Sequence, residues 1–259
     1  MRELKISAVS YLNTKPLLYG LVRSSLRDRV DISLDIPSIG AQKLKAGKVD
    51  LGLVPVAIIP EIENARIVSD FCIGSEGEVK TVSIFSRVPI QNVQRLFLDF
   101  HSRTSIQLAQ VLLREYWKVD PELIPAKEGF VERLEATDAA VVIGDRTIGL
   151  EEDFPYIYDL SAAWRKHTGL PFVFAAWVTN RPLPKGFEAA FNEALRDGID
   201  SIPELQLILP SPHPNFSLEE YFTRYISYEL TEPKRRGLRL FLQKMRENEA
   251  NLRPTAPSY

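Results

Sequence analysis

The fold is decided near the start of the chain, by residues 4–16, which read LKISAVSYLNTKP. The apolar residues up to Val9 are typical of a strand, and a polar turn then leads into an apolar helical pattern over Lys15–Leu26. Pro16 suits the first turn of a helix, where a missing N–H costs no hydrogen bond. A strand that passes through a polar turn into a helix is the opening of an α/β unit.

The same alternation continues beyond this helix. Residues Val30–Ile36 alternate apolar and polar side chains, as a half-buried strand does. Ser38 can cap a short helix that ends near Gly47, and Val49–Val54 predicts a third strand that runs into Pro55. Strands and helices in this order predict a parallel sheet with right-handed crossovers.

A second α/β series follows. Two apolar runs without a helix between them, Ile67–Ile73 and Val79–Phe85, separate it from the first series. Further strands are expected at Leu96–Phe100, Asp138–Ile143, Tyr156–Leu160 and Phe172–Val178, and helices at Thr104–Trp117, at Phe130–Glu135, at Phe187–Leu195, after the capping box Ser217–Glu220 and after Thr231.

These series predict an α/β protein of two lobes, with mixed sheets flanked by helices and a ligand cleft between the lobes. We expect one lobe to comprise residues 1–83 and 176–259, including the C-terminal helices, and the other to comprise residues 84–175. No low-complexity linker separates the two series, so extended hinge strands near 81–86 and 172–177 are expected to join the lobes.

The composition is that of an ordinary globular protein. Of the 259 residues 45% are hydrophobic and 25% are charged, and a formal net charge of -2 gives no sign of a nucleic-acid or membrane-surface binder. The single cysteine, Cys72, excludes a disulfide within the chain. The first apolar run is too short for a secretion signal, and no stretch is long enough to span a bilayer. We therefore expect a cytoplasmic protein with a small-molecule ligand and neither nucleic-acid nor membrane partners, and the tail helices offer surface for a homodimer.

Two polar helix starts are candidate anion sites. Ser10–Lys15 follows the first strand, and Asp99–Ser105 follows the strand that opens the second series. A helix N-terminus offers free N–H groups and a partial positive charge, and Arg103 could add a bidentate contact with a carboxylate. Ordinary capping of the two helices, with a solvent-facing Arg103, is the alternative explanation.

Two further segments could reach the cleft. Near the expected hinge, Lys80 and Thr81 should face opposite sides of a strand, and Thr81 is the better candidate for a cleft residue. Gly144 and Asp145 follow a buried strand. Asp145 could be a general base, an anchor for Arg103 or Arg146, or a helix cap, and the structural roles are favoured because a carboxylate repels an anionic ligand.

Other kinds of chemistry leave no trace in the sequence. There is no nucleophile elbow, no phosphate-binding GxxxxGK[ST] motif and no GxGxxG motif. The histidines His101, His167 and His213 lie far apart, with no cysteine or acidic pair at metal-binding spacing. We therefore expect neither a metal nor a nucleotide cofactor.

Several segments taken together resemble one family. They are Val9–Leu17, Asp99 with Ser102–Ser105, Ile143–Arg146, Asp159 and Leu160 with Trp164, and Thr168–Ala175 with Trp177. In this order, over residues 9–177, they resemble the chorismate dehydratases of menaquinone biosynthesis. The C-terminal helices carry no motif that matches this family.

The resemblance implies a type 2 periplasmic-binding-protein fold that works as an enzyme. The implied reaction converts chorismate to 3-[(1-carboxyvinyl)oxy]benzoate and water, in the futalosine route to menaquinone. Asn13 and the hinge hydroxyl would be catalytic, although the family usually has serine where this chain has Thr81, whose methyl group restricts its rotamers. The substrate-binding residues expected around them are Ser10, Tyr11, Thr14, Lys15, Val54, Pro55, Ser102, Arg103, Thr104, Ser105, Gly144 and Asp145.

Three other functions stay open at this point. A cytosolic small-anion binding or sensor protein would share the fold without catalysis. A carrier for a transporter would need an export signal or a lipidated cysteine. The sibling pathway enzyme, 1,4-dihydroxy-6-naphthoate synthase, shares the fold but has a proline- and cysteine-containing N-terminal loop that differs from Ser10–Lys15.

Overall fold

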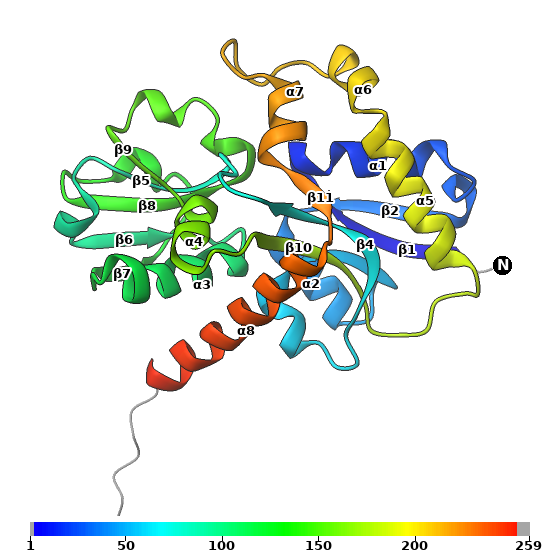
Figure 1. Cartoon of the computed structure of the whole chain (residues 1–259), viewed down its shortest axis with the longest axis horizontal. Coiled ribbons are helices and arrows are strands. Elements are labelled where there is room, and N and C mark those ends of the chain that lie inside the picture. Colours follow the sequence, from blue (N-terminus) through cyan, green and yellow to red (C-terminus); the bar gives the residue numbers. More distant parts are fainter. Residues whose placement is uncertain (1–2, 253–259) are drawn as a thin grey trace, which may run out of the picture.

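A computed structural model describes residues 3–252 and contains two mixed β-sheets flanked by helices (Figure 1). The first sheet has the order β11-β4-β10-β3-β1-β2 and the second the order β7-β6-β8-β5-β9. The first is built from β1 (Leu4–Val9), β2 (Val30–Asp35), β3 (Leu51–Pro55), β4 (Arg66–Ser75), β10 (Phe172–Thr179) and β11 (Ser227–Glu229). The second is built from β5 (Val82–Ser86), β6 (Arg95–Leu98), β7 (Glu122–Pro125), β8 (Asp138–Ile143) and β9 (Tyr156–Asp159). Each sheet with its helices is called a lobe below.

Strand direction explains why polar loops gather between the lobes. In the first sheet β1 is parallel to β2 and β3, and β10 is antiparallel to β3 and β4. In the second sheet β6 is parallel to β7 and β8, and β5 is antiparallel to β8 and β9. The loops at the carboxyl ends of parallel strands collect at one edge of a sheet, where ligands bind in such folds.

Helices cover the sheets of both lobes. The first lobe carries α1 (Lys15–Arg23), α2 (Pro37–Lys45), α5 (Phe187–Asp200), α6 (Ile202–Ile208) and α7 (Leu218–Glu220), and the 3₁₀ turns η1 (Leu12–Thr14), η2 (Arg27–Arg29) and η3 (Val56–Glu61). The second carries α3 (Arg103–Leu112), α4 (Leu160–Thr168), the π-helical η5 (Leu113–Trp117) and the 3₁₀ turns η4 (Ile90–Asn92), η6 (Val131–Arg133), η7 (Gly144–Thr147) and η8 (Leu150–Glu152). Between α1 and α5 the backbones touch, because a Cβ on Gly20 would stand 1.9 Å from the carbonyl oxygen of Ala194.

The last helix, α8 (Glu232–Leu252), runs across both lobes (Figure 1). At its start the buried Nζ of Lys234 donates to the carbonyl oxygen of Ser227 in the first lobe, at 2.9 Å. Towards its end Lys244 forms an ion pair with Glu115, and Arg114 donates to Asn248 at 3.0 Å. Glu115 and Arg114 lie in the π turn of the second lobe, so this helix is fastened to both bodies.

Several expected elements differ in detail from the structure. Ser38 lies inside α2 and does not cap it, because Pro37 occupies the first turn and Ile36 is the N-cap. Strand β5 begins at Val82, since Lys80 has a φ of 66° and interrupts the extended backbone. The expected helix over Thr104–Trp117 changes from α to π after Leu112. Strands β7 and β11 and helices α4 and α6 had not been predicted.

The chain passes from the first sheet to the second between β4 and β5, and returns between β9 and β10. The expected hinge strands therefore each belong to one sheet, β5 to the second and β10 to the first. The proposed lobe limits and the hinge stay predictions, and residues 253–259 of the first expected lobe lie outside the described residues. None of the helices between residues 3 and 252 is long and apolar enough to cross a membrane.

Candidate active site between the lobes

A small cavity of about 40 Å³ lies between the two lobes. Most of its wall is apolar, with side chains such as Val9, Ile143 and Phe174. Its polar lining comes from both lobes and consists of Tyr11, Asn13, Thr81, Ser102 and Ser105. An apolar pocket with a few converging polar groups is typical of a binding site for a small molecule.

The first lobe contributes the turn after β1. Strand pairing ends at Val9, and the N–H of Ser10 donates to the carbonyl oxygen of Asp35 at 3.0 Å. The chain then turns through η1 into α1, which brings the side chain of Asn13 to the cavity. The Asn13 side-chain oxygen accepts from Thr14 Oγ1 at 3.2 Å, and its backbone carbonyl accepts from the Tyr228 hydroxyl at 2.9 Å. Asn13 is therefore held at both its side chain and its backbone.

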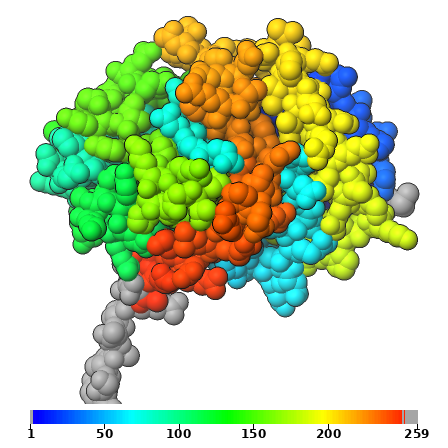
Figure 2. All heavy atoms as spheres, viewed as in Figure 1, coloured from blue at the N-terminus to red at the C-terminus, as the bar shows by residue number. Residues whose placement is uncertain are grey.

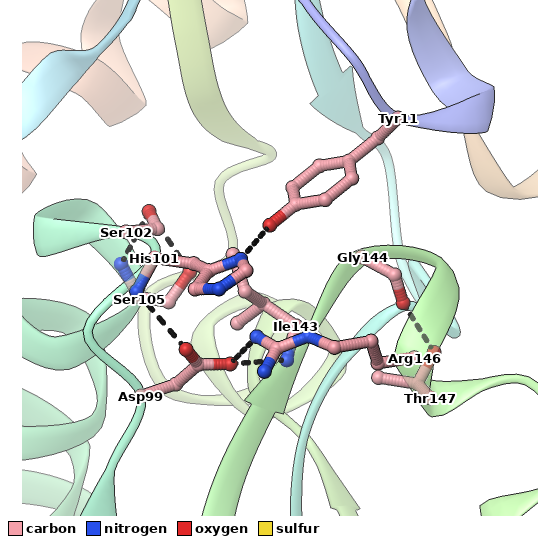
Figure 3. Close-up of polar contacts among 9 residues, drawn as sticks. All are labelled: Tyr11, Asp99, His101, Ser102, Ser105, Ile143, Gly144, Arg146 and Thr147. Carbon is pink, nitrogen blue, oxygen red and sulfur yellow. Dashed lines mark hydrogen bonds and ion pairs between the residues drawn. The ribbon is translucent and has the colours of Figure 1, made fainter. Parts of the chain in front are cut away.

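The second lobe contributes the N-terminus of α3. Ser102 is the N-cap of this helix, and its hydroxyl accepts from the N–H and the hydroxyl of Ser105, at 3.4 Å each. Just before it, the buried carboxylate of Asp99 accepts from the N–H groups of His101 and Ile143 and pairs with Arg146 (Figure 3). Asp99 thus ties the loop after β6 to the strand β8 and fixes the place of the two serines.

Contacts between the lobes close the cavity on one side. The Tyr11 hydroxyl lies 2.6 Å from Nδ1 of His101, and the Tyr11 ring covers Gly144, where a Cβ would stand 2.8 Å from the ring (Figure 3). Both oxygens of Asp145 accept from the N–H of Leu12, at 3.0 Å. Because Tyr11 and Leu12 belong to the first lobe and the other three to the second, these contacts hold the lobes together.

The environment of this contact shifts several pKa values. Burial raises the pKa of Tyr11 above its ordinary value and, together with the positive charge of Arg146, lowers the pKa of His101. Burial also raises the pKa of Asp145, although the N–H of Leu12 opposes this shift. The imidazole is therefore held in its neutral form in the closed arrangement.

Thr81 also lines this cavity, at the turn before β5. Asp159, the N-cap of α4, accepts from the N–H groups of Val79 and Lys80 at 2.9 Å and 2.8 Å. These bonds hold the turn and place Thr81, which is 1% exposed, at the cavity. Its hydroxyl lies 2.9 Å from the hydroxyl of Tyr221. A second cavity of about 320 Å³, with Lys80 and Tyr225 in its wall, meets the first at Thr81.

The expected site residues divide into two groups. The cavity is lined by Tyr11, Asn13, Pro55, Thr81, Ser102, Ser105 and Gly144. The others lie outside this lining, namely Ser10, Thr14, Lys15, Val54, Arg103, Thr104 and Asp145. Thr14 nevertheless holds Asn13, and the buried Thr104 hydroxyl accepts from the N–H of Ala57 at 3.2 Å. That these residues bind substrate stays a prediction.

Two expected partnerships are wrong. Arg103 pairs with Glu61 at 2.7 Å on the surface and not with Asp145, because the first residue of α3 points away from the cavity. Asp145 binds neither arginine, since Arg146 turns to Asp99. The Asp145 carboxylate accepts from the N–H of Leu12 at the start of the first helix. A substrate carboxylate had been expected at this position.

The C-terminal segment contributes residues that sequence reasoning missed. Tyr221 and Tyr228 approach Thr81 and Asn13, although they follow them by 140 and 215 residues. In Figure 2 this part of the chain (orange) covers the surface between the second lobe (green) and α5 and α6 (yellow). The sequence placed Tyr221 only in a helix expected after the capping box Ser217–Glu220. No spacing in the sequence points to either contact.

Comparison with known proteins places the chain in a family. A family model described as menaquinone biosynthesis matches residues 4–247. The chain belongs to this menaquinone biosynthesis family. A chorismate dehydratase from Thermus thermophilus is 29% identical to this member over 266 aligned positions, which cover 94% of this chain and 95% of the relative. The expected resemblance to chorismate dehydratases is thereby confirmed.

Solved structures confirm the fold of this family member. Protein AF1704 from Archaeoglobus fulgidus has a TM-score of 0.72 at 14% identity, covering 96% of this chain and 98% of its own. The Candida albicans CA3427 gene product, described as exhibiting the generic periplasmic binding protein structural fold, has a TM-score of 0.63 at 12% identity, covering 100% of this chain and 98% of its own.

Among residues 3–252 no group of three or more His, Cys, Asp or Glu side chains could hold a metal ion.

Proposed function

We propose that this protein is an enzyme of menaquinone biosynthesis, a chorismate dehydratase that converts chorismate to 3-[(1-carboxyvinyl)oxy]benzoate and water. The family match and the similarity to the Thermus thermophilus enzyme support this proposal. The observation that carries it is the meeting of Asn13 and Thr81, from distant parts of the chain, in the lining of one cavity between the lobes.

The elimination of water from chorismate needs only limited help from the protein. Chorismate loses one ring proton and one allylic hydroxyl group, and the ring of the product is aromatic, so the elimination is strongly downhill. The enzyme then needs to hold the dianion in a reactive geometry and to stabilise the departing hydroxyl. The cavity offers the amide of Asn13 and the hydroxyl of Thr81 for these tasks.

The anionic groups of the substrate need donors. The start of α3, a ten-residue helix, adds N–H groups and a partial positive charge beside Ser102 and Ser105. We assign one substrate carboxylate to this end of the cavity. Closure of the lobes around it would remove water and strengthen each of these contacts.

The protein groups that could act as a base are already engaged. Asp145 accepts from Leu12, and His101 faces the hydroxyl of Tyr11. We therefore assign the ring proton to the enolpyruvyl carboxylate of the substrate itself. The proton and the departing hydroxide then leave as one water molecule, so the reaction needs no other reactant.

The closed cavity is too small for this substrate. A volume of about 40 Å³ holds only a few water molecules, far less than a six-membered ring with two carboxylate-bearing groups. Substrate binding in this cavity therefore requires the lobes to separate, and the contacts of Tyr11, Gly144 and Asp145 are among those that must break and form again.

Incubation of the purified protein with chorismate tests the proposal. We expect 3-[(1-carboxyvinyl)oxy]benzoate to appear, detected by chromatography and mass spectrometry, and to be much reduced with Asn13→Ala. Unchanged chorismate at high protein concentration overturns the enzyme assignment. Binding of chorismate in calorimetry without turnover would favour a sensor, and turnover of the futalosine-derived substrate alone would favour the sibling enzyme.

A further inference from the structure

Tyr221 places a buried hydroxyl beside both residues to which the proposed function assigns catalysis. Its oxygen lies 2.9 Å from Oγ1 of Thr81, and the side chain of Tyr221 is 1% exposed. The side chain of Asn13 is a further polar neighbour of this hydroxyl and favours its ionised form. Burial raises the pKa of Tyr221, while the hydrogen bond with Thr81 opposes this shift, so the phenol keeps its proton at neutral pH.

The backbone that carries Tyr221 is unusual. Residues Tyr221–Tyr225 form a single π-helical turn directly after the short helix α7, which Ser217 caps. Such turns are rare and occur often at functional sites, because they change the direction in which a side chain points. The ring is packed against Phe216 and Phe222, with centroids at 5.1 Å and 5.7 Å. Because the Tyr221 ring is fixed by this packing, the position of its hydroxyl is fixed as well.

The donors and acceptors around Asn13 and Thr81 indicate the direction of the hydrogen bonds that link these two residues through Tyr221. Thr14 Oγ1 donates to the side-chain oxygen of Asn13, so the Asn13 NH₂ group is the one available to the oxygen of Tyr221. Either hydroxyl could donate between Tyr221 and Thr81, and we assign the donation to Tyr221 because Thr81 Oγ1 donates to the Val79 carbonyl at 3.4 Å. This long contact with Val79 is one that a substrate oxygen can replace.

We propose that Tyr221 is a positioning residue, which orients the amide of Asn13 and turns the hydroxyl hydrogen of Thr81 towards the substrate. This inference rests on the proposed function and deepens it. Without the Tyr221 hydroxyl, Thr81 Oγ1 loses its donor, so the Thr81 hydrogen can remain on the Val79 carbonyl and the hydroxyl then offers the substrate a lone pair. The methyl group of Thr81 limits the rotamers that could correct this.

The test compares Tyr221→Phe with Tyr225→Phe, which removes a hydroxyl from the same π turn. The Tyr225 hydroxyl donates to the partly exposed Glu220 at 3.2 Å. With chorismate as substrate, we expect Tyr221→Phe to lower kcat by about 10- to 100-fold, as a misdirected catalytic group does, while KM changes by less than about threefold. Tyr225→Phe should leave both values near those of the wild type.

A double variant separates positioning from a general effect on folding. If Tyr221 acts partly through Thr81, then Tyr221→Phe should lower kcat by clearly less in the Thr81→Val protein than in the wild type. Fully multiplicative losses in kcat, or an unchanged kcat for Tyr221→Phe, overturn the role of Tyr221. A wild-type protein that does not convert chorismate overturns the proposed function itself.

If Tyr221→Phe does not fold, 3-fluorotyrosine incorporated at position 221 replaces it in the test. The fluorine keeps the ring and makes the hydroxyl a stronger donor. We then expect kcat to change by more than about twofold with KM preserved. An unchanged kcat in this protein contradicts the proposal.

Discussion

The hydroxyl of Tyr11 lies 2.6 Å from Nδ1 of His101, although Tyr11 follows the first strand of one lobe and His101 follows β6 of the other. This contact, the seat of the Tyr11 ring on Gly144 and the bond from Leu12 to Asp145 form the closed side of the cavity. Opening of the cleft must break all three. The strength of these contacts therefore sets how readily substrate enters and product leaves.

Removing the Tyr11 hydroxyl should weaken closure. A hydrogen bond of this kind contributes about 1 kcal/mol, so Tyr11→Phe should raise the KM for chorismate by about 3- to 10-fold. It should also increase the radius of gyration measured by small-angle X-ray scattering. Tyr19→Phe is the control, because its hydroxyl contacts Arg23 on the exposed face of α1. Identical scattering and KM for the two variants would contradict a closing role for Tyr11.

Closure should also depend on pH through His101. Burial and the charge of Arg146 lower the pKa of His101 in the closed arrangement, so the closed form binds fewer protons than the open one. Closure is then fully present above the open-state pKa, about 6.5, and is lost as the pH falls through that value towards the lowered pKa. Scattering between about pH 7.5 and about pH 5 should show this opening, and His101→Gln should abolish this dependence in the same pH range. A profile that His101→Gln leaves unchanged would assign the effect to another group.

Substitution of Gly144 should cost both stability and activity. Its φ of 69° disfavours a side chain, and the new Cβ would meet the Tyr11 ring. We expect Gly144→Ala to lower the free energy of unfolding by about 2 kcal/mol and to reduce turnover strongly. Gly169→Ala, with a φ of 74° and no atom within 4 Å of the new Cβ, should cost about 1 kcal/mol. Gly77→Ala has neither problem and should stay within about 0.5 kcal/mol in urea denaturation. Equal losses for all three would refute the contact with Tyr11 as the cause.

Two substitutions at the cleft distinguish a protein base from a substrate base. Asn13→Ala removes a group that lines the cavity, and we expect kcat to fall by about 100-fold or more. Asp145→Asn keeps an oxygen that can accept from the N–H of Leu12, so kcat should fall by less than about 10-fold. The measurement is steady-state turnover of chorismate. The reverse ranking would identify Asp145 as the base.

Local patterns predicted the first α/β unit well, for a physical reason. In this unit β1, β2, α2 and β3 contact one another although α1 packs mainly on the distant α5, so the periodicity of most of the apolar residues reports a face that is buried against nearby elements. The polar turn Ser10–Lys15 at the end of β1 was predicted as a candidate site for the same reason, and Tyr11 and Asn13 of this turn line the cavity. The position of a helix start relative to its strand depends only on nearby residues.

Contacts between distant segments could not be predicted in this way. The bond between Thr81 and Tyr221 depends on how the C-terminal segment crosses between the lobes, and a capping box followed by aromatic residues is compatible with any buried helix. The direction of the Arg103 side chain depends on which residue begins α3. In the structure this side chain pairs with Glu61 of the other lobe. Charge at a helix start therefore predicted an anion site but not which side chain faces it.

The helix α8 limits the motion that the cavity requires. Lys234 fixes its beginning to the first lobe, and Lys244 and Asn248 fix its later part to the second. Two bodies fastened along one rigid rod can rotate about it, but they cannot move apart along its length. We therefore expect opening to be a rotation of one lobe relative to the other about an axis along α8, which separates Tyr11 from His101.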